Sequence, residues 1–130
     1  MKKVFLGGTC NGSFWRDELI RDLKMDYFQP MSDQWTPAMM DEEIRQREEC
    51  DYCLYVITPK MEGFYSIAEL VDDSNKRPEK TIFCFLENDG EHSFTPHQVK
   101  SLETTATLIK NNGASFFKSL ADVAIFLNNQ

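Results

Sequence analysis

The run Cys53-Leu54-Tyr55-Val56-Ile57 constrains the fold of this chain more than any other segment. A strand with one face in water alternates apolar and polar side chains, and this run has no such alternation. Near-continuous apolar runs are typical of strands in parallel sheets, where helices cover both faces. The sequence therefore predicts a central strand over 53–57 that is buried on both sides.

Other apolar runs alternate along the chain with segments of helical spacing. The further predicted strands cover 4–6, 26–29, 81–86 and 115–117, with a polar loop over 87–94. The predicted helices begin near Ser13, Pro37, Ser66, Pro96 and Ser119, where capping residues or prolines stand. Right-handed crossovers wind such a pattern into an α/β three-layer sandwich. We expect a five-stranded parallel sheet with strand order 2-1-3-4-5.

Length and charge narrow the class of protein. At 130 residues with 42% hydrophobic residues, the chain fits one domain over 1–130 with a single core. Its net charge of -7 argues against binding a nucleic acid polymer, which requires clustered lysine and arginine. The apolar run near the N-terminus is too short for a signal peptide, and no run approaches membrane-spanning length. We therefore expect a cytoplasmic protein without a membrane partner.

The four cysteines are Cys10, Cys50, Cys53 and Cys84, of which only Cys50 and Cys53 form a C-x-x-C pair. A redox pair requires both thiols at a helix N-terminus, whereas Cys53 belongs to the predicted central strand. The sequence favours reduced, half-buried cysteines over a redox or zinc site.

Two loops bring polar groups to one edge of the predicted sheet. In such a sheet the binding crevice opens between strands one and three, at their carboxyl ends. Residues 7–12 follow the first strand and residues 63–69 follow the third. Glycines there let backbone N–H groups approach a polar ligand. The predicted substrate-binding residues are Gly7, Gly8, Thr9, Asn11, Gly63, Tyr65 and Ser66.

Glu69 has two interpretations. Ser66-Ile67-Ala68-Glu69 has the S-x-x-E form of a capping box, in which the glutamate only binds its own helix start. Alternatively, Glu69 lies in the first turn of a helix that faces the crevice, where the helix dipole keeps a carboxylate ionised. An ionised carboxylate can attack an anomeric carbon or stabilise an oxocarbenium ion.

Chemistry at a glycosidic carbon usually takes a second carboxyl group. Asp41, Glu42 and Glu43 lie about two turns into the predicted second helix, whose N-terminus we expect at the same edge of the sheet. The alternative is a solvated acidic face paired with Arg45 or Arg47.

Two further groups of residues complete the list of candidates. Asp72 and Asp73 fit a solvated helix face. Trp15, Trp35 and Tyr65 are placed to stack on a nucleobase, or to fill the edge of the core.

Residues 4–9, the Glu42-Glu43 helix before Asp51, and residues 63–69 with 75–77 together resemble the nucleoside 2-deoxyribosyltransferase-like family. This resemblance implies a flavodoxin-like sandwich that cleaves the N-glycosidic bond of deoxynucleosides or their monophosphates through a glutamate nucleophile. It places Glu69 at the nucleophile and Glu43 at an acidic residue that contacts substrate. It implies no metal or organic cofactor, a nucleoside or nucleotide as small-molecule partner, and a homo-oligomer.

Two other functions stay open at this point. The spacing of residues 63–69, with an aromatic residue and a serine before the glutamate, is also similar to Toll/interleukin-1 receptor domains whose enzymatic members cleave nicotinamide from NAD. A third possibility is a non-catalytic pocket that senses or sequesters a nucleotide, which applies if Glu69 only caps its helix.

Overall fold

The computed structural model describes residues 1–10, 12–30 and 36–130. Five parallel strands form the main sheet in the order β2-β1-β3-β4-β7. These strands are β1 (Lys3–Gly8), β2 (Asp26–Phe28), β3 (Tyr52–Ile57), β4 (Thr81–Phe85) and β7 (Ser115–Phe117). Because β5 and β6 belong to a separate hairpin, this order is the predicted 2-1-3-4-5 arrangement, and the prediction is confirmed.

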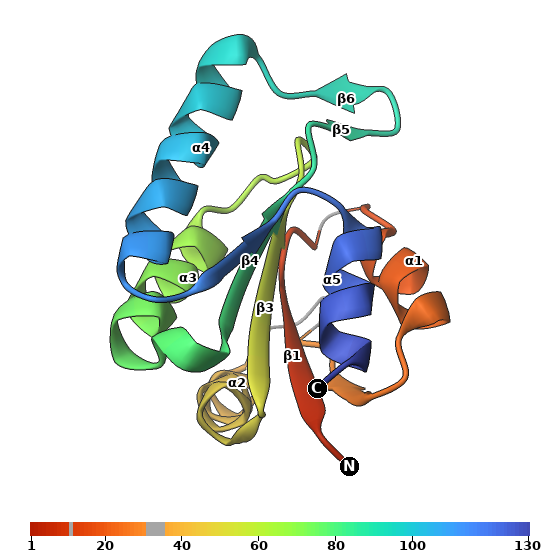
Figure 1. Cartoon of the computed structure of the whole chain (residues 1–130), viewed down its shortest axis with the longest axis vertical. Helices are drawn as coiled ribbons and strands as arrows, with labels where there is room; N and C mark the ends of the chain where they lie inside the picture. Colours follow the sequence, from red (N-terminus) through yellow and green to blue (C-terminus); the bar gives the residue numbers. More distant parts are fainter. Residues whose placement is uncertain (11, 31–35) are drawn as a thin grey trace.

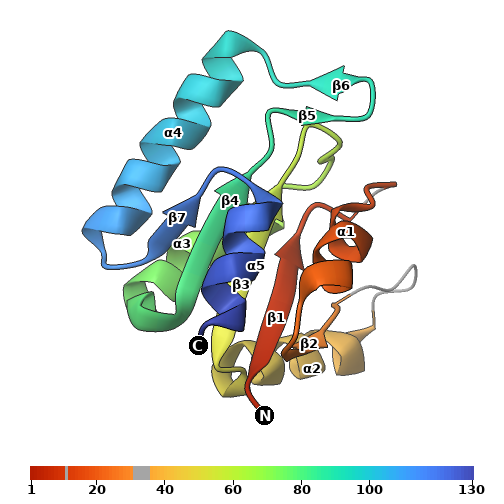
Figure 2. The ribbon, with the colours of Figure 1, turned by 45° about the vertical axis from the view of Figure 1, so that its right-hand side comes forward.

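Helices cover both faces of the sheet, as Figures 1 and 2 show. One face carries α1 (Trp15–Asp22) and α5 (Leu120–Asn128). The other carries α2 (Pro37–Glu49), α3 (Tyr65–Lys76) and α4 (Pro96–Asn111), and a short 3-10 turn, η1 (Pro78–Lys80), leads into β4. The molecule is therefore the predicted α/β three-layer sandwich.

The apolar side chains form one core on each face of the sheet, instead of the single core that the sequence predicted. Along β3, Cys53, Tyr55 and Ile57 pack under α3 and α4, whereas Leu54 and Val56 pack under α1 and α5. All five side chains are fully buried, so the lack of alternation in this run reflects a strand covered on both sides.

Threonine and serine caps set three of the five helix starts. Thr36 Oγ1 accepts from Met39 N before α2, Thr95 forms a capping box with Gln98 before α4, and Ser119 accepts from Asp122 N before α5. The other two helices start without a side-chain cap: α1 at Trp15 instead of Ser13, and α3 at Tyr65 instead of Ser66.

Two features differ from the predicted layout. The polar loop over 87–94 contains a short antiparallel hairpin, β5 (Asn88–Asp89) and β6 (His92–Ser93), with Gly90 at a φ of 62° in its turn. Helix α2 crosses the lower part of the sheet and is seen almost end-on in Figure 1, near the start of β3. The expectation that α2 begins at the carboxyl edge of the sheet is therefore wrong.

No helix among residues 1–10, 12–30 and 36–130 is long and apolar enough to span a membrane.

Candidate active site

Glu69 does not cap its own helix. Helix α3 begins at Tyr65 with Phe64 as its N-cap residue, and no side chain caps that start. Glu69 is thus the fifth residue of α3 rather than a member of its first turn, so the capping-box interpretation is wrong. Its side chain is only 13% exposed, and its Oε2 atom lies 3.6 Å from Nη1 of Arg47.

The environment of Glu69 favours its protonated form. Burial is the largest cause, and the nearby carboxylates of Glu43, Asp73 and Asp72 add to it, whereas Arg47 acts in the opposite direction. Together they raise the pKa of Glu69 to about 7. The sequence predicted a carboxylate that is ionised at neutral pH; with this pKa the carboxyl group is only partly ionised there. At neutral pH the group can both accept and give up a proton.

Glu43 is the predicted second carboxyl group. It lies on α2, where its charge acts on Glu69 and on the guanidinium of Arg16. Its neighbour Glu42 points elsewhere: it pairs with Arg45, which also binds Glu49 on the exposed surface. The solvated acidic face expected here exists for Glu42, which binds Arg45 and Gln46 and not Arg47.

Arg47 pairs with α3 and not with its own helix. Its Nη2 atom lies 2.9 Å from Asp73 Oδ1 and 3.0 Å from Asp72 Oδ2. Burial alone would lower the pKa of Arg47, but the hydrogen bond to Asp73 and the surrounding negative charges raise it. Arg47 therefore stays charged inside the protein.

Asp73 does not lie on a solvated helix face, as the sequence suggested, but is fully buried. Its carboxylate accepts hydrogen bonds from Tyr55 Oη, Arg47 and Arg77. Sequence reasoning missed this cluster, which we call the Asp73 network: Arg47, Tyr55, Asp73 and Arg77. The i, i+4 spacing of residues 69, 73 and 77, which places them on one face of a helix, was the available signal.

Gly7 and Gly8 are required by the packing of β1 against β3. A Cβ atom on Gly7 would lie 2.8 Å from the Tyr55 ring, and one on Gly8 would lie 2.0 Å from Val56 O. Gly8 also has a φ of 118°, which favours glycine. These glycines bring two strands together, which is a reason for their presence that needs no ligand.

Thr9 is also engaged within the protein. Its hydroxyl accepts a hydrogen bond from Thr58 N at 2.9 Å, and it is 4% exposed. Its carbonyl oxygen accepts from Trp15 Nε1 at 2.8 Å and from Arg16 Nη1 at 2.7 Å. Trp15 is accordingly part of the core and not a surface for base stacking.

Arg16 is a second buried arginine, 3% exposed, on the opposite face of the sheet. It donates to the carbonyl oxygens of Leu6 and Thr9 and lies 3.4 Å from that of Gly8. Burial lowers the pKa of Arg16, while Cys10 and Glu43 act in the opposite direction. This arginine fixes the end of β1 through backbone acceptors.

The β5–β6 hairpin is tied to both loops of the site through Asp89. Asp89 accepts from Ser13 Oγ at 2.6 Å and pairs with Lys60 at 3.8 Å, and Lys60 donates to Gly12 O at 3.2 Å. Burial alone would raise the pKa of Asp89, but hydrogen bonds from Ser13 and Thr58 hold it below its usual range. The loops after β1, β3 and β4 therefore meet at one carboxylate.

The remaining predicted binding residues are exposed or half-buried. Tyr65 is 66% exposed, Ser66 is half-buried, and a Cβ atom on Gly63 would meet no atom within 4 Å. Asn11 and Trp35 lie outside the described residues. The substrate-binding roles of these residues stay predictions.

The cysteines form no redox pair in the structure. Cys50 and Cys53 are free and buried, and burial raises the pKa of Cys53 to about 12, which disfavours a thiolate. Within the described ranges, no group of three or more His, Cys, Asp or Glu side chains is placed to hold a metal ion.

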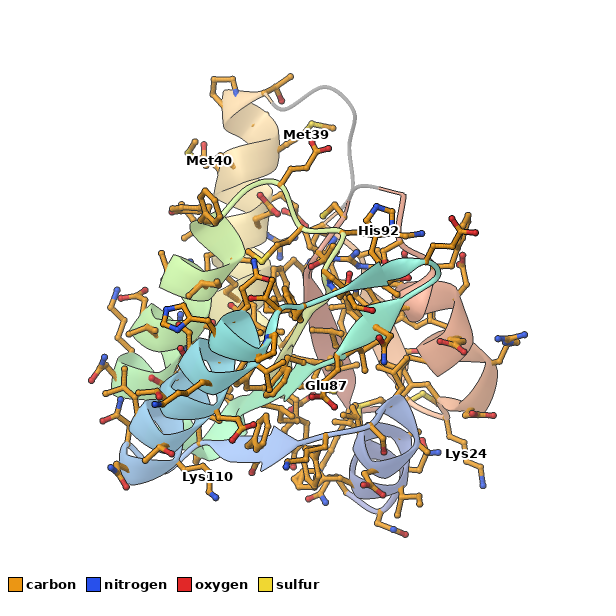
Figure 3. All side chains as sticks on the ribbon, turned by 90° about the horizontal axis from the view of Figure 1, so that it is seen from above. Lys24, Met39, Met40, Glu87, His92 and Lys110 are labelled. Atoms are coloured by element: carbon orange, nitrogen blue, oxygen red, sulfur yellow. The ribbon has the colours of Figure 1, made fainter. Side chains whose placement is uncertain are left out.

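A hollow of about 290 Å³ lies away from Glu69, at the end of β4. Its lining residues are Phe85, Leu86, Glu87, Asn88, Glu103 and Lys118. Glu87 is labelled in Figure 3, on the segment that leads into the hairpin.

Comparison with known proteins identifies the family of this chain. The family described as "nucleoside 2-deoxyribosyltransferase like" matches residues 1–88, which include β1, β3, Glu43 and Glu69. The match covers more than half of the chain, so this protein belongs to the nucleoside 2-deoxyribosyltransferase-like family. Curated proteins give no match to the sequence.

Proposed function

We propose that this protein cleaves or transfers the N-glycosidic bond of deoxynucleosides or their 5′-monophosphates, with Glu69 as the nucleophile. One observation carries the proposal: in a chain of this family, Glu69 is a largely buried carboxyl group with a pKa of about 7, beside a second carboxyl group, Glu43. Buried carboxyl groups that titrate near neutral pH concentrate at catalytic sites.

In the proposed reaction, the ionised Glu69 carboxylate attacks C1′ of the sugar. A C–O bond forms to the carboxylate oxygen as the C1′–N bond breaks, and the base leaves with the electron pair of that bond and takes up a proton. Water or the nitrogen of a second base then attacks C1′ and releases the Glu69 carboxylate. Water gives the free sugar, and a base gives a new nucleoside.

Glu43 has the supporting role. We assign it to orienting the sugar or relaying the proton to the leaving base, because its charge acts directly on Glu69. Two carboxyl groups with separate tasks are the usual arrangement for glycosidic chemistry.

The charges at this edge favour an unphosphorylated substrate. Among the described residues, Arg47 is the cation that acts on Glu69, and it already binds Asp72 and Asp73. Residues 11 and 31–35 include no lysine, arginine or histidine. A 5′-phosphate would meet the carboxylates of Glu43, Glu69 and Asp72 without a free guanidinium to neutralise it.

The test is incubation of the pure protein with deoxynucleosides, their monophosphates and NAD, with chromatography of the released base. We expect base from deoxynucleosides and less from monophosphates. The Glu69→Gln variant should lose activity by about 10³-fold or more, and Glu42→Gln, a matched change on the exposed face of α2, should retain it. Turnover by Glu69→Gln would refute the nucleophile. Nicotinamide release would favour the NAD-cleaving alternative, and tight binding without turnover a sensor.

We also propose a homo-oligomer. Met39, Met40 and Ile44 on α2 and Phe64 and Tyr65 at the start of α3 are exposed apolar side chains. Figure 3 shows Met39 and Met40 near the outer end of α2. Light scattering tests this proposal, and a monomer at micromolar concentration would contradict it.

A further inference from the structure

The Asp73 network connects three elements through one carboxylate. Asp73 on α3 is fully buried and accepts from Tyr55 on β3, Arg47 on α2 and Arg77 just after α3. Lost hydrogen bonds to a buried charge are costly, so this carboxylate has little freedom to move.

The geometry of Arg47 follows from Asp73. Nε of Arg47 donates to Asp73 Oδ2 at 3.2 Å and Nη2 donates to Oδ1 at 2.9 Å, which is a two-point contact that fixes the plane of the guanidinium. The remaining nitrogen, Nη1, is then left 3.6 Å from Glu69 Oε2. The position of the cation beside Glu69 is therefore set by a different carboxylate.

The charges that face Glu69 come from two helices. Helix α2 contributes Arg47 and Glu43, and α3 contributes Asp72 and Asp73. Among the residues that the structure describes, Arg47 is the cation within ion-pair distance of Glu69, and it is shared with Asp72 and Asp73. Its attraction for Glu69 is weaker than an unshared guanidinium would exert.

We propose that Asp73 is a positioning residue, which orients the Arg47 guanidinium and divides its charge between the buried Asp73 carboxylate and the Glu69 carboxyl group. Asp73 touches no substrate in this arrangement and acts through Arg47. The proposal rests on the proposed catalytic role of Glu69. It gives Asp73 a specific task, which is to keep Glu69 able to exchange a proton near neutral pH.

The experiment is a carbon-13 NMR titration of the side-chain carboxyl groups in the full chain without substrate, with the Glu69 signal assigned by its loss in Glu69→Gln. In Asp73→Asn, the Arg47 guanidinium no longer pairs with a carboxylate at position 73, so it attracts the Glu69 carboxylate more strongly. One negative charge near Glu69 is also removed. The titration midpoint of Glu69 should therefore fall by about one pH unit. In Arg77→Gln, Asp73 keeps its charge but loses one hydrogen-bond donor, so it pairs more strongly with Arg47. The titration midpoint of Glu69 should therefore rise.

Arg45→Gln is the matched control, because Arg45 pairs with Glu42 and Glu49 on the exposed surface of α2, away from the carboxylates that share Arg47. Its midpoint should stay within about 0.3 units of the original protein, as expected for an exposed pair. Arg77 is partly exposed, so Arg77→Gln keeps the proposal testable if Asp73→Asn does not fold.

If Asp73 had only a structural role, Asp73→Asn would lower the urea midpoint of unfolding without moving the titration midpoint of Glu69. That result would overturn the proposal. The acidic limb of the pH profile of kcat/KM should move with the NMR midpoint. If Glu69→Gln stayed active, the proposed function would fail while the titration still decided whether Asp73 controls Glu69.

Discussion

The two buried arginines of this protein, Arg16 and Arg47, lie on opposite faces of one sheet and are stabilised in opposite ways. Arg16 donates to backbone carbonyl oxygens at the end of β1, and burial lowers its pKa. Arg47 meets three carboxyl groups, and its pKa is raised despite its burial. The carbonyl oxygens bound by Arg16 fix the loop after β1. The carboxylates bound by Arg47 join α2 to α3 and include Glu69.

The largest expected effect comes from breaking the charged side. Arg47→Met leaves the fully buried Asp73 and the largely buried Glu69 without their shared cation. We expect a loss of about 3 to 5 kcal/mol in the free energy of unfolding, measured by urea denaturation. Arg45→Met removes an exposed arginine from the same helix, and its loss should stay below about 1 kcal/mol. Equal losses for the two variants would contradict the distinction between them.

The free energy of unfolding should be less sensitive to the loss of Arg16, which binds neutral acceptors. Arg16→Met removes hydrogen bonds to backbone carbonyl oxygens but also removes a buried charge, so the two effects partly offset each other. We expect a loss of about 1 to 3 kcal/mol in the free energy of unfolding, measured by urea denaturation. In the Arg16→Met background, Asp73→Asn and Arg77→Gln should shift the NMR midpoint of Glu69 as they do in the original protein. A loss as large as that of Arg47→Met would show that backbone acceptors stabilise a buried arginine as strongly as carboxylates do.

The smallest effect concerns Glu69 and depends on pH. Its pKa is raised from the ordinary glutamate value of 4.5 to about 7 in the folded protein, so the folded state binds more protons between these values. The stability of the original protein should therefore fall as pH rises from about 4.5 to 7 and level off above. Glu69→Gln removes this cost. We expect it to be more stable by about 1 to 2 kcal/mol at pH 8, because the side chain is partly exposed and solvent screens part of the cost of ionising it.

At pH 5 that advantage should disappear, because the original Glu69 is then protonated in the folded state. Thermal unfolding of both proteins at pH 5 and pH 8 checks the sign. An advantage of the same size at both pH values would mean that the carboxyl group of Glu69 is not desolvated.

Much of the fold was predictable, and the failures have physical causes. The buried run 53–57 and the caps Thr36, Thr95 and Ser119 predicted the layers and three helix starts, because these features act over a few residues. The hairpin over Asn88–Ser93 was missed because each strand has two residues and is held by Asp89 through contacts distant in sequence. The start of α3 was placed one residue late because its S-x-x-E pattern matches a cap that does not form.

The sequence by itself determined the parallel sheet, its order and the placement of Glu69 on a helix after the central strand, since apolar periodicity and capping are properties of neighbouring residues. Tertiary structure alone decided the state of that carboxyl group. Packing α2 against α3 buries Asp73 and turns Arg47 away from its own helix, and it brings Glu43 near Glu69. Burial and the sharing of one cation among several carboxylates arise only when separate segments meet, so no local pattern encodes them.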